Sequence, residues 1–386
     1  MNGNEALGFG LIAAGVRFGA GYPITPWSDI MELLRRELPK YGGTFVQCED
    51  EIASISMAIG AGYAGRVAVT GSSGPGISLK TEGLGWAVMA EMPLIIVDVQ
   101  RGGPSTGMPT NVEQSDLNIA CFGGHGDSPR VVLAPASVED CFYTAIEAVN
   151  IARKYSVPVF ILSDQAIATR IEAFEEPNLE KVCQDISPDL TPVADHKPYD
   201  LSAEGGVTRH LAPGTRIASG KYPVVTGLEH DEMGHPTGSP KLHTQMTAKR
   251  RKKLQTLASE LPVPKIYGPN EGNILLVGWG STQGPLREAV DKARAAGDSV
   301  SALQFKIPAA TNSLYAHWAY HGLPDAKQFY SRHKRIQELY QEQREERVNL
   351  WRDVSRLRLA LPETAQAYLS SYRKLTAFQD KPGDLP

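Results

Sequence analysis

The feature that most constrains the fold is the regular alternation, over residues 1–170, of short apolar runs with helix-like patterns. The runs are rich in Val and Ile and nearly continuous in apolar character, which is typical of strands buried on both faces. Strands that alternate with helices favour a parallel sheet. We therefore predict an α/β fold with a doubly wound parallel sheet, whose strands lie at residues 44–47, 67–71, 94–100, 130–134 and 157–163.

Helix patterns occupy the segments between these runs. The clearest covers residues 137–155, where Ser137 can cap the first turn and apolar residues recur at helical spacing. Further patterns cover residues 4–15 and 79–90. Because open parallel sheets bind ligands at the carboxyl ends of their strands, the loops that follow the strands are the place to look for a functional site.

Composition excludes several classes of protein. The 386 residues include 39 basic and 43 acidic side chains, and this net charge of −4 argues against broad binding to nucleic acid or to anionic membranes. A membrane-spanning helix is unexpected, since it needs about 18 uninterrupted apolar residues, and the N-terminus lacks the basic end of a signal peptide. The 4 cysteines form no CxxC pair, so we expect no metal cluster in the usual spacing and a reduced, cytoplasmic location.

The chain changes character after residue 170, where charged residues become more frequent. A proline-rich stretch with few periodic apolar residues predicts a long connection, and a strand, a glycine-rich turn and a helix pattern at 284–296 follow it. A charged amphipathic pattern at 327–361 predicts either a solvated helix or a helix that binds a partner. We therefore expect four parts: a first module at 1–175, a connection that wraps it at 176–272, a second α/β segment at 273–308, and a charged helical tail at 309–386.

A stiff turn at residues 22–26 follows the first helix pattern and carries a candidate polar group. In the sequence Tyr22, Pro23, Ile24, Thr25, Pro26, the prolines stiffen the backbone that carries the Thr25 hydroxyl, which suits a group that orients a substrate. An ordinary turn is the alternative.

Three carboxylates, Glu49, Asp50 and Glu51, come next, between a strand and a helix. They either complement the helix dipole or include a catalytic acid placed in low-dielectric surroundings.

A glycine-rich run at 70–76, which includes Ser73 and Gly74, follows the next predicted strand. Glycine lets a ligand approach the backbone closely, but the run has neither the ending of a P-loop nor the GxGxxG pattern. The run of acidic and histidine residues at 229–232 is a weak metal-site candidate, because contiguous side chains diverge in an extended segment.

The loop that begins with Arg101 follows the most apolar strand. Arg101 presents a planar fork for a carboxylate, and Ser105, Thr106 and Thr110 add hydroxyl groups, so the loop suits a small anionic substrate. A flexible surface loop is the alternative. His125, in Gly-Gly-His-Gly, is a candidate proton carrier or carboxylate partner, or else a structural or merely exposed histidine.

The order of these motifs along the chain is specific. It runs GYPITP, CEDEIASI, TGSSGPG, VDVQRGGPSTGMPT, GGHGDSPRVVLAP and VPVFILSDQ, followed by TGLEHDEMG and GNILLVGWGSTQGPLREAV. In this respect the chain resembles the alpha subunit of 2-oxoacid:ferredoxin oxidoreductases, most closely the 2-oxoglutarate type, over roughly residues 3–303. From Ala309 onward the sequence is unlike that family, so the second domain is expected to be incomplete or to end in a divergent tail.

The resemblance implies a fold and a division of labour. The first module would be the pyrimidine-binding module of thiamine-diphosphate enzymes, and the second α/β segment would resemble the transketolase C-terminal domain. A beta subunit would hold the diphosphate through Mg²⁺ and carry an iron–sulfur cluster, so this chain would be inactive alone. Coenzyme A would be a co-substrate and ferredoxin the electron acceptor, and the gamma module would be a separate chain or absent.

The resemblance also implies roles for individual residues. Glu51, with Glu49 as the alternative, would share a proton with the pyrimidine ring nitrogen, and Thr25 and Arg101 match the positions that bind the 2-oxoacid. The remaining implied contacts are to the coenzyme, from Tyr22, Pro23, Ser73 and Gly74, and to the substrate, from Ser105, Thr110 and His125.

Three hypotheses about function follow. The first is oxidative decarboxylation of 2-oxoglutarate with coenzyme A to succinyl-CoA, CO₂ and reduced ferredoxin. The second is the same chemistry on pyruvate or on a branched or aromatic 2-oxoacid. The third is a non-catalytic scaffold that keeps the fold.

Overall fold

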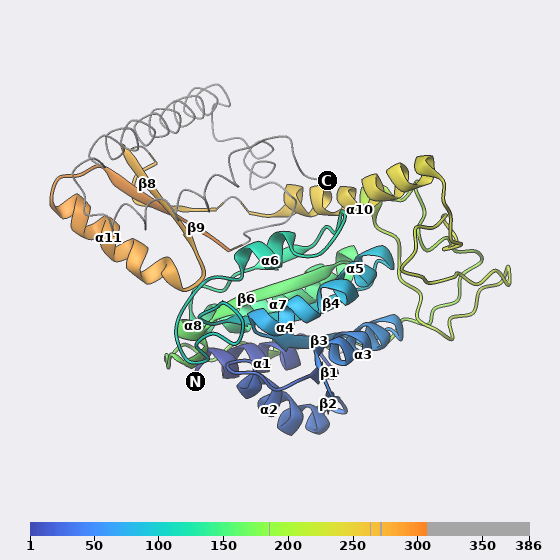
Figure 1. The fold of residues 1–386 in the computed structure, drawn as a ribbon, viewed down its shortest axis with the longest axis horizontal. Helices are drawn as coiled ribbons and strands as arrows, with labels where there is room; N and C mark the ends of the chain where they lie inside the picture. The colour runs from blue at the N-terminus through green and yellow to red at the C-terminus, as the bar shows by residue number, and fades with distance from the viewer. Residues whose placement is uncertain (185, 263, 271, 307–386) are drawn as a thin grey trace, which may run out of the picture. The chain divides into compact units, whose positions relative to one another are not determined.

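The computed structural model describes residues 1–184, 186–262, 264–270 and 272–306. Its first part is a six-stranded sheet with the order β2-β1-β3-β4-β6-β5, in which every neighbouring pair is parallel (Figure 1). The predicted doubly wound α/β fold is therefore confirmed. The strands are β1 (Phe18–Gly21), β2 (Thr44–Gln47), β3 (Ala68–Ser72), β4 (Leu94–Gln100), β5 (Val131–Leu133) and β6 (Pro158–Asp164).

Helices cover both faces of this sheet. Along β4, Ile95 and Val97 point into one apolar core and Leu94 and Ile96 into the other, which is why the strand is apolar throughout. The first core includes side chains of α1 (Gly3–Ala13), α2 (Ser28–Glu37), α7 (Val138–Tyr155) and α8 (Gln165–Thr169). The second includes side chains of α3 (Glu51–Tyr63), α4 (Gly74–Leu79), α5 (Thr81–Met89) and α6 (Leu117–Phe122).

Strand β1 was not predicted, because its sequence Phe-Gly-Ala-Gly contains no apolar run. Glycine is required there by two aromatic rings. A Cβ atom on Gly19 would lie 2.4 Å from the Phe45 ring, and one on Gly21 would lie 3.0 Å from Nε1 of Trp27. The neighbouring β2 is an edge strand with no buried residue, so the expectation that this strand is buried on both faces is wrong.

The helix boundaries follow local capping chemistry. Ser137 Oγ accepts a hydrogen bond from the Asp140 backbone N–H at 3.1 Å and starts α7, as predicted. The helix pattern expected at 79–90 is confirmed as α5, and the short helix α4, which was not predicted, precedes it and ends at Leu79, just before Lys80. The short 3₁₀ helices are η1 (Leu38–Tyr41), η2 (Glu204–Gly206) and η3 (Gly280–Thr282).

The proline-rich connection contains the short helix α9 (Leu179–Val182) and a helix of 21 residues, α10 (Pro240–Glu260), which was not predicted. The face that α10 buries includes Lys249, Arg250 and Lys253 beside the apolar Leu254. A pattern search for apolar periodicity misses such a helix, because cations occupy several of its buried positions.

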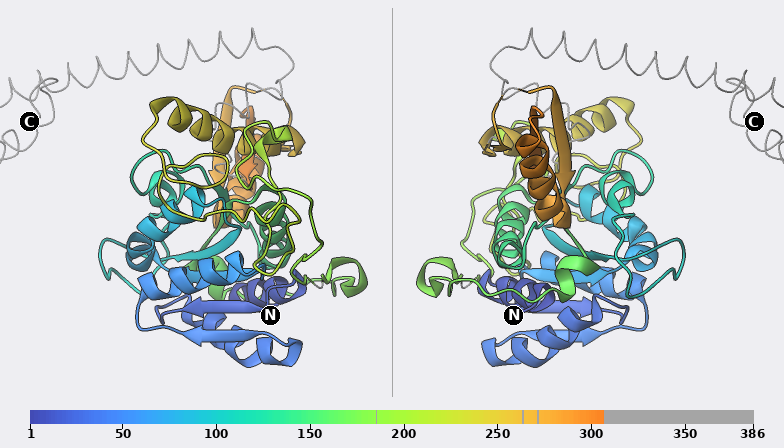
Figure 2. Two further views of the ribbon diagram at one scale, coloured as in Figure 1. Left: turned by 90° about the vertical axis from the view of Figure 1, so that its right-hand side faces the viewer. Right: turned by 90° about the vertical axis from the view of Figure 1, so that its left-hand side faces the viewer.

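A second, three-stranded sheet with the order β7-β9-β8 follows. Strands β8 and β9 are parallel, and β7 and β9 are antiparallel. Helix α11 lies against this sheet, in orange in Figure 2. Its residue Val290 packs with Val300 and Ala302 of β9. The predicted strand, glycine turn and helix are thus confirmed. The elements are β7 (Ile266–Tyr267), β8 (Ile274–Trp279), α11 (Gln283–Ala295) and β9 (Val300–Phe305).

The expected tail at 309–386, with its amphipathic pattern at 327–361, lies outside the described residues. Among the residues that are described, no helix has the length and apolar character needed to cross a membrane.

Candidate active site

The candidate site lies at one edge of the six-stranded sheet. Because its strands are parallel, the segments that follow β1, β2, β3 and β4 all emerge at their carboxyl ends. These segments carry, in order, the Tyr22–Pro26 turn, Glu51, the Ser73 and Gly74 pair, and Arg101.

Glu51 differs from its two acidic neighbours in burial. Asp50 caps α3, since its Oδ1 accepts from the Ala53 backbone N–H at 2.7 Å, and Glu51 is the first residue of the helix. Glu51 is only 6 % exposed, whereas Glu49 and Asp50 are exposed. Of the three carboxyl groups, Glu51 alone sits in the low-dielectric surroundings that acid–base chemistry with a bound ring requires.

The carboxyl group of Glu51 is held on one side only. Its Oε1 accepts from Ser72 Oγ at 3.5 Å. A Cβ atom on Gly76 would lie 2.5 Å from that Oε1 and 1.9 Å from Ser72 Oγ, so position 76 must be glycine for the loop to close over the carboxyl group. The Oε2 atom makes no hydrogen bond or ion pair with any described residue, which leaves it free to accept one from a ligand.

A buried lysine stands behind Glu51. Lys80 is 1 % exposed, and its Nζ donates to the Glu51 carbonyl at 3.0 Å, to Thr70 Oγ1 at 3.2 Å and to Ser54 Oγ. Burial lowers the pKa of Lys80 to about 8, while the negative charge of Glu51 acts in the opposite direction. The sequence pattern did not single out this residue. Its signal was an isolated lysine inside the apolar helix pattern at 79–90.

Arg101 joins two loops. Its guanidinium donates to the Thr25 carbonyl at 2.6 Å and to the Thr106 carbonyl at 2.7 Å, and its Nε is buried without a hydrogen-bond partner among the described residues. Burial lowers the pKa of Arg101, and the Asp116 charge opposes this. The structure thus brings Arg101 and Thr25 together, with the Thr25 side chain exposed beside the arginine.

Two more carboxyl groups lie beneath this loop. Asp98, inside β4, is fully buried and neither carboxylate oxygen has a partner among the described residues. Burial raises the pKa of Asp98 well above its ordinary range, and the charge of Asp116 raises it further. The sequence carries a signal for this residue, since Asp98 interrupts the most apolar run of the chain, but that run predicted only a buried strand.

The other predicted site residues fall into two groups, those that contact the sheet or its loops and those that are exposed. Ser73 Oγ donates to the Val99 carbonyl at 2.9 Å, and a Cβ on Gly74 would lie 2.7 Å from Asp116 Oδ1, so both residues close the loop onto the sheet. The remaining five are accessible: Tyr22, Pro23, Ser105, Thr110 and His125 are exposed, and among the described residues none has a side-chain hydrogen bond or ion pair. Among the contacts of the described residues, none joins His125 to the Arg101 loop.

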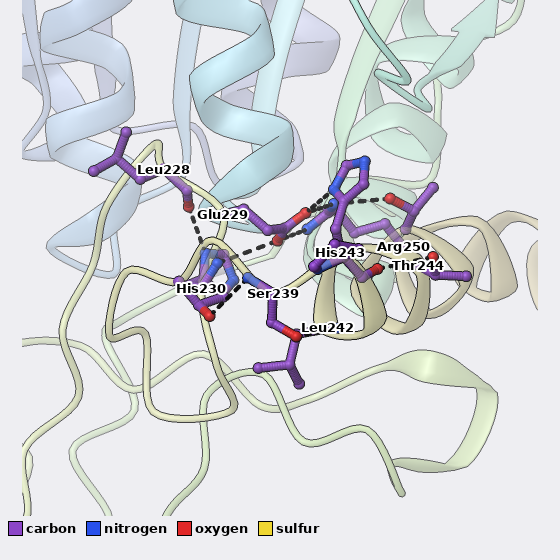
Figure 3. A network of polar contacts seen from close by, with 11 residues as sticks. Leu228, Glu229, His230, Ser239, Leu242, His243, Thr244 and Arg250 are labelled. Atoms are coloured by element: carbon purple, nitrogen blue, oxygen red, sulfur yellow. Dashed lines mark hydrogen bonds and ion pairs between the residues drawn. The ribbon is translucent and has the colours of Figure 1, made fainter.

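The run at 229–232 diverges as expected. Glu229 lies between Arg250, with contacts of 3.2 and 3.0 Å, and His243 (Figure 3). Asp231 and Glu232 pair with His235 and Lys197 instead. These side chains serve separate contacts of the connection.

Comparison with known proteins places this geometry in a family. A family model described as "Pyruvate flavodoxin/ferredoxin oxidoreductase, thiamine diP-bdg" matches residues 9–249, which is more than half of the chain. The chain belongs to this family. A 2-oxoglutarate synthase subunit KorA from Methanocaldococcus jannaschii is 40 % identical over 300 residues, which are 77 % of this chain and 79 % of that protein.

Two further relatives are longer than this chain. The 2-oxoglutarate oxidoreductase subunit KorA from Mycobacterium tuberculosis is 42 % identical over 78 % of this chain but only 46 % of its own length. A solved structure of 2-oxoglutarate:ferredoxin oxidoreductase from Magnetococcus marinus, with 2-oxoglutarate, coenzyme A and succinyl-CoA bound, has a TM-score of 0.75 and 42 % identity. It matches 80 % of this chain and 53 % of that chain, so this chain spans about half of both longer relatives.

Proposed function

We propose that this chain is the alpha subunit of a 2-oxoglutarate:ferredoxin oxidoreductase, which converts 2-oxoglutarate and coenzyme A to succinyl-CoA, CO₂ and reduced ferredoxin. The observation that carries the proposal is the buried Glu51 carboxyl, with one unengaged oxygen, at the ligand-binding edge of a sheet of this family. The 2-oxoglutarate enzymes among its relatives support the choice of substrate.

The residues around Glu51 fit the pyrimidine half of thiamine diphosphate. A ring nitrogen of the pyrimidine needs a partner that can exchange a proton with it. The Oε2 atom of Glu51 has no hydrogen-bond partner among the described residues and can accept a hydrogen bond from that ring. When bound, the coenzyme supplies the nucleophilic carbon and takes up the electron pair that the departing CO₂ leaves. Glu51 would hold the shared proton, and Gly76 would leave room for its carboxyl group. The other proposed coenzyme contacts are Tyr22, Pro23, Ser73 and Gly74.

The Arg101 loop would bind the 2-oxoacid. Arg101 is positioned by its contacts to the Thr25 and Thr106 carbonyls, and its buried Nε has no hydrogen-bond partner among the described residues. A substrate carboxylate would gain a charge-assisted hydrogen bond there. We propose Thr25, Ser105, Thr110 and His125 as the additional polar contacts to the substrate.

The rest of the machinery would come from other chains. A beta subunit would supply Mg²⁺, the diphosphate site and the iron–sulfur cluster. Among the described residues, no group of three His, Cys, Asp or Glu side chains could hold a metal ion. We also propose the four-part division at residues 175, 272 and 308, and a cytoplasmic location where ferredoxin accepts the electrons.

The same chemistry on pyruvate is the second candidate, because the description of the matching family names pyruvate. Assaying 2-oxoglutarate, pyruvate and branched or aromatic 2-oxoacids with the reconstituted complex separates the two. The proposal requires 2-oxoglutarate to give the highest kcat/KM.

Substitution of Glu51 is the sharpest test of the proposal. Glu51→Gln in the reconstituted complex removes the exchangeable proton while keeping the shape, and we expect oxoacid-dependent dye reduction to fall by about 10²–10⁴-fold. Glu49→Gln changes an exposed carboxyl two residues away and should have little effect. A large loss in Glu49→Gln alone would move the role to Glu49, and full activity in both variants would favour the scaffold hypothesis.

A further inference from the structure

Lys80 has no part in the function proposed so far, yet its position is unusual. It lies at the junction of α4 and α5, and its ammonium contacts the first turn of α3 through the Glu51 carbonyl and β3 through Thr70. An ammonium 1 % exposed is costly to bury, and in most proteins such a group is paired directly with a carboxylate.

We propose that Lys80 is a positioning residue for Glu51, whose buried positive charge holds the Glu51 carboxyl in the form and orientation that exchanges a proton with the coenzyme. The inference rests on the function proposed for Glu51. It deepens that function by naming the second charge of the same site.

The contacts of Lys80 support a role in charge rather than in packing. Its three hydrogen bonds go to a carbonyl and to two hydroxyl groups, none of which carries charge. The titratable groups that act on it are Glu51 on α3, and Cys48 and Asp50 on the segment before α3. Glu51 is the only buried carboxyl among them, and the Lys80 ammonium lies 3.0 Å from the backbone carbonyl of that same residue, so the charge of Lys80 is held next to Glu51.

The surrounding polar groups do not need Lys80. Ser54 Oγ already donates to the Glu51 carbonyl at 2.9 Å, and Thr70 Oγ1 lies 3.4 Å from Ser54 Oγ. A neutral side chain of similar length at position 80 would therefore leave these groups with partners. The positive charge of Lys80 therefore adds little to the stability of the fold. We infer that the charge serves the site of Glu51.

The charge of Lys80 would make the site sensitive to alkaline pH. Because burial lowers the pKa of Lys80 to about 8, the ammonium is charged below this value and neutral above it. Its effect on Glu51 is present at neutral pH and is lost as the pH rises through 8. A lysine with an ordinary pKa would lose its charge only near about 10.4.

The test compares wild type with Lys80→Met and Lys80→Gln in the reconstituted complex. Two quantities are followed from about pH 6 to about pH 10. One is kcat/KM for the 2-oxoacid, and the other is the near-ultraviolet circular dichroism of the bound coenzyme, which reports the protonation of its pyrimidine without turnover. Lys80→Gln keeps a hydrogen-bond donor, so it remains informative if Lys80→Met does not assemble.

We expect kcat at neutral pH to fall about tenfold in both variants, with KM nearly unchanged, and the dichroism transition to move by about one pH unit. The wild-type decline in activity near pH 8 should be absent from both. Ser54→Ala is the matched control, because it removes one contact of Lys80 while keeping the charge, and it should retain the wild-type pH profile.

Wild-type pH profiles and spectra in both Lys80 variants would overturn the inference, as would a loss of activity that is equal at every pH. Failure of the proposed function is distinguishable. A wild-type complex that turns over no 2-oxoacid would refute that function, whereas the coenzyme spectrum would still decide the role of Lys80.

Discussion

Two buried clusters of lysine and glutamate in this molecule differ in how completely they are paired. In the first, both carboxylate oxygens of Glu91 accept from Lys249 Nζ, at 2.8 and 2.7 Å, and Oε2 also contacts Lys253. In the second, Lys80 reaches the backbone carbonyl of Glu51 rather than its carboxyl, and one carboxyl oxygen of Glu51 has no partner among the described residues. Both carboxylate oxygens are therefore paired with ammonium groups in the first cluster, and among the described residues neither is paired with an ammonium group in the second.

The difference agrees with a structural role for the Glu91 cluster and with the role that we propose for Glu51. Burial alone would raise the pKa of Glu91, but the two ammonium groups lower it, so the carboxylate is fixed in its ionised form. Lys253 also donates to the Ser156 carbonyl at 3.1 Å, so the cluster attaches α10 to the first module. Glu51 keeps the ability to bind a further group, and this unused capacity is what a ligand site needs.

The largest effect of a substitution is expected in the Glu91 cluster. Glu91→Gln removes the carboxylate that compensates two buried ammonium groups, and we expect the free energy of unfolding to fall by about 3 kcal/mol. Urea unfolding followed by tryptophan fluorescence measures this change. The activity of the assembled complex should be unaffected, since Glu91 precedes β4 and lies away from the carboxyl ends of the strands. A variant as stable as wild type would remove the basis for calling this cluster structural.

The next effect concerns the glycine that closes over Glu51. Gly76→Ala places a Cβ within 2.5 Å of Glu51 Oε1, so the carboxyl group must move. We expect roughly a 10²-fold loss of oxoacid-dependent activity, in line with a misplaced catalytic group, measured by dye reduction in the complex. Retained activity would show that the position of the Glu51 carboxyl does not matter.

The smallest effect is expected in the control for that variant. Gly60→Ala is also a glycine replacement, in the interior of α3, where the new Cβ meets nothing within 4 Å. Because alanine favours a helix over glycine, the free energy of unfolding should rise by about 0.5–1 kcal/mol. A destabilised Gly60→Ala would indicate that α3 tolerates no change, and it would weaken the interpretation of Gly76→Ala.

Much of the fold was predictable, because apolar runs and capping residues are local signals. The strand β4 and the helix α7 followed from their apolar patterns and from Ser137. Strand β1 and helix α10 were not predictable in this way. The packing of Trp27 and Phe45 requires glycine in β1, and ion pairing to Glu91 places lysines on the buried face of α10. Both are tertiary effects that override local pattern.

The loops that form the candidate site could be predicted from the sequence. The contacts between their side chains could not. The loop of Arg101 was predicted at the ligand-binding edge, because it follows a predicted parallel strand. The turn of Thr25 follows β1, which was not predicted, so only the family resemblance placed Thr25 with Arg101. The residue pattern alone did not distinguish Glu51 from Glu49, because their burial depends on how Gly76 and the α4 loop pack, and only the family resemblance favoured Glu51. Lys80 became meaningful only when its distance to the Glu51 carbonyl was known.

The central claim is that this chain provides one half of a shared coenzyme site. The most direct measurement is 2-oxoglutarate-dependent reduction of a dye, in the presence of thiamine diphosphate, Mg²⁺ and coenzyme A, by the purified chain alone and after addition of its beta subunit. We predict no turnover by the chain alone, full turnover by the pair, and loss of that turnover when the chain carries Glu51→Gln. Turnover by the chain alone would contradict the claim.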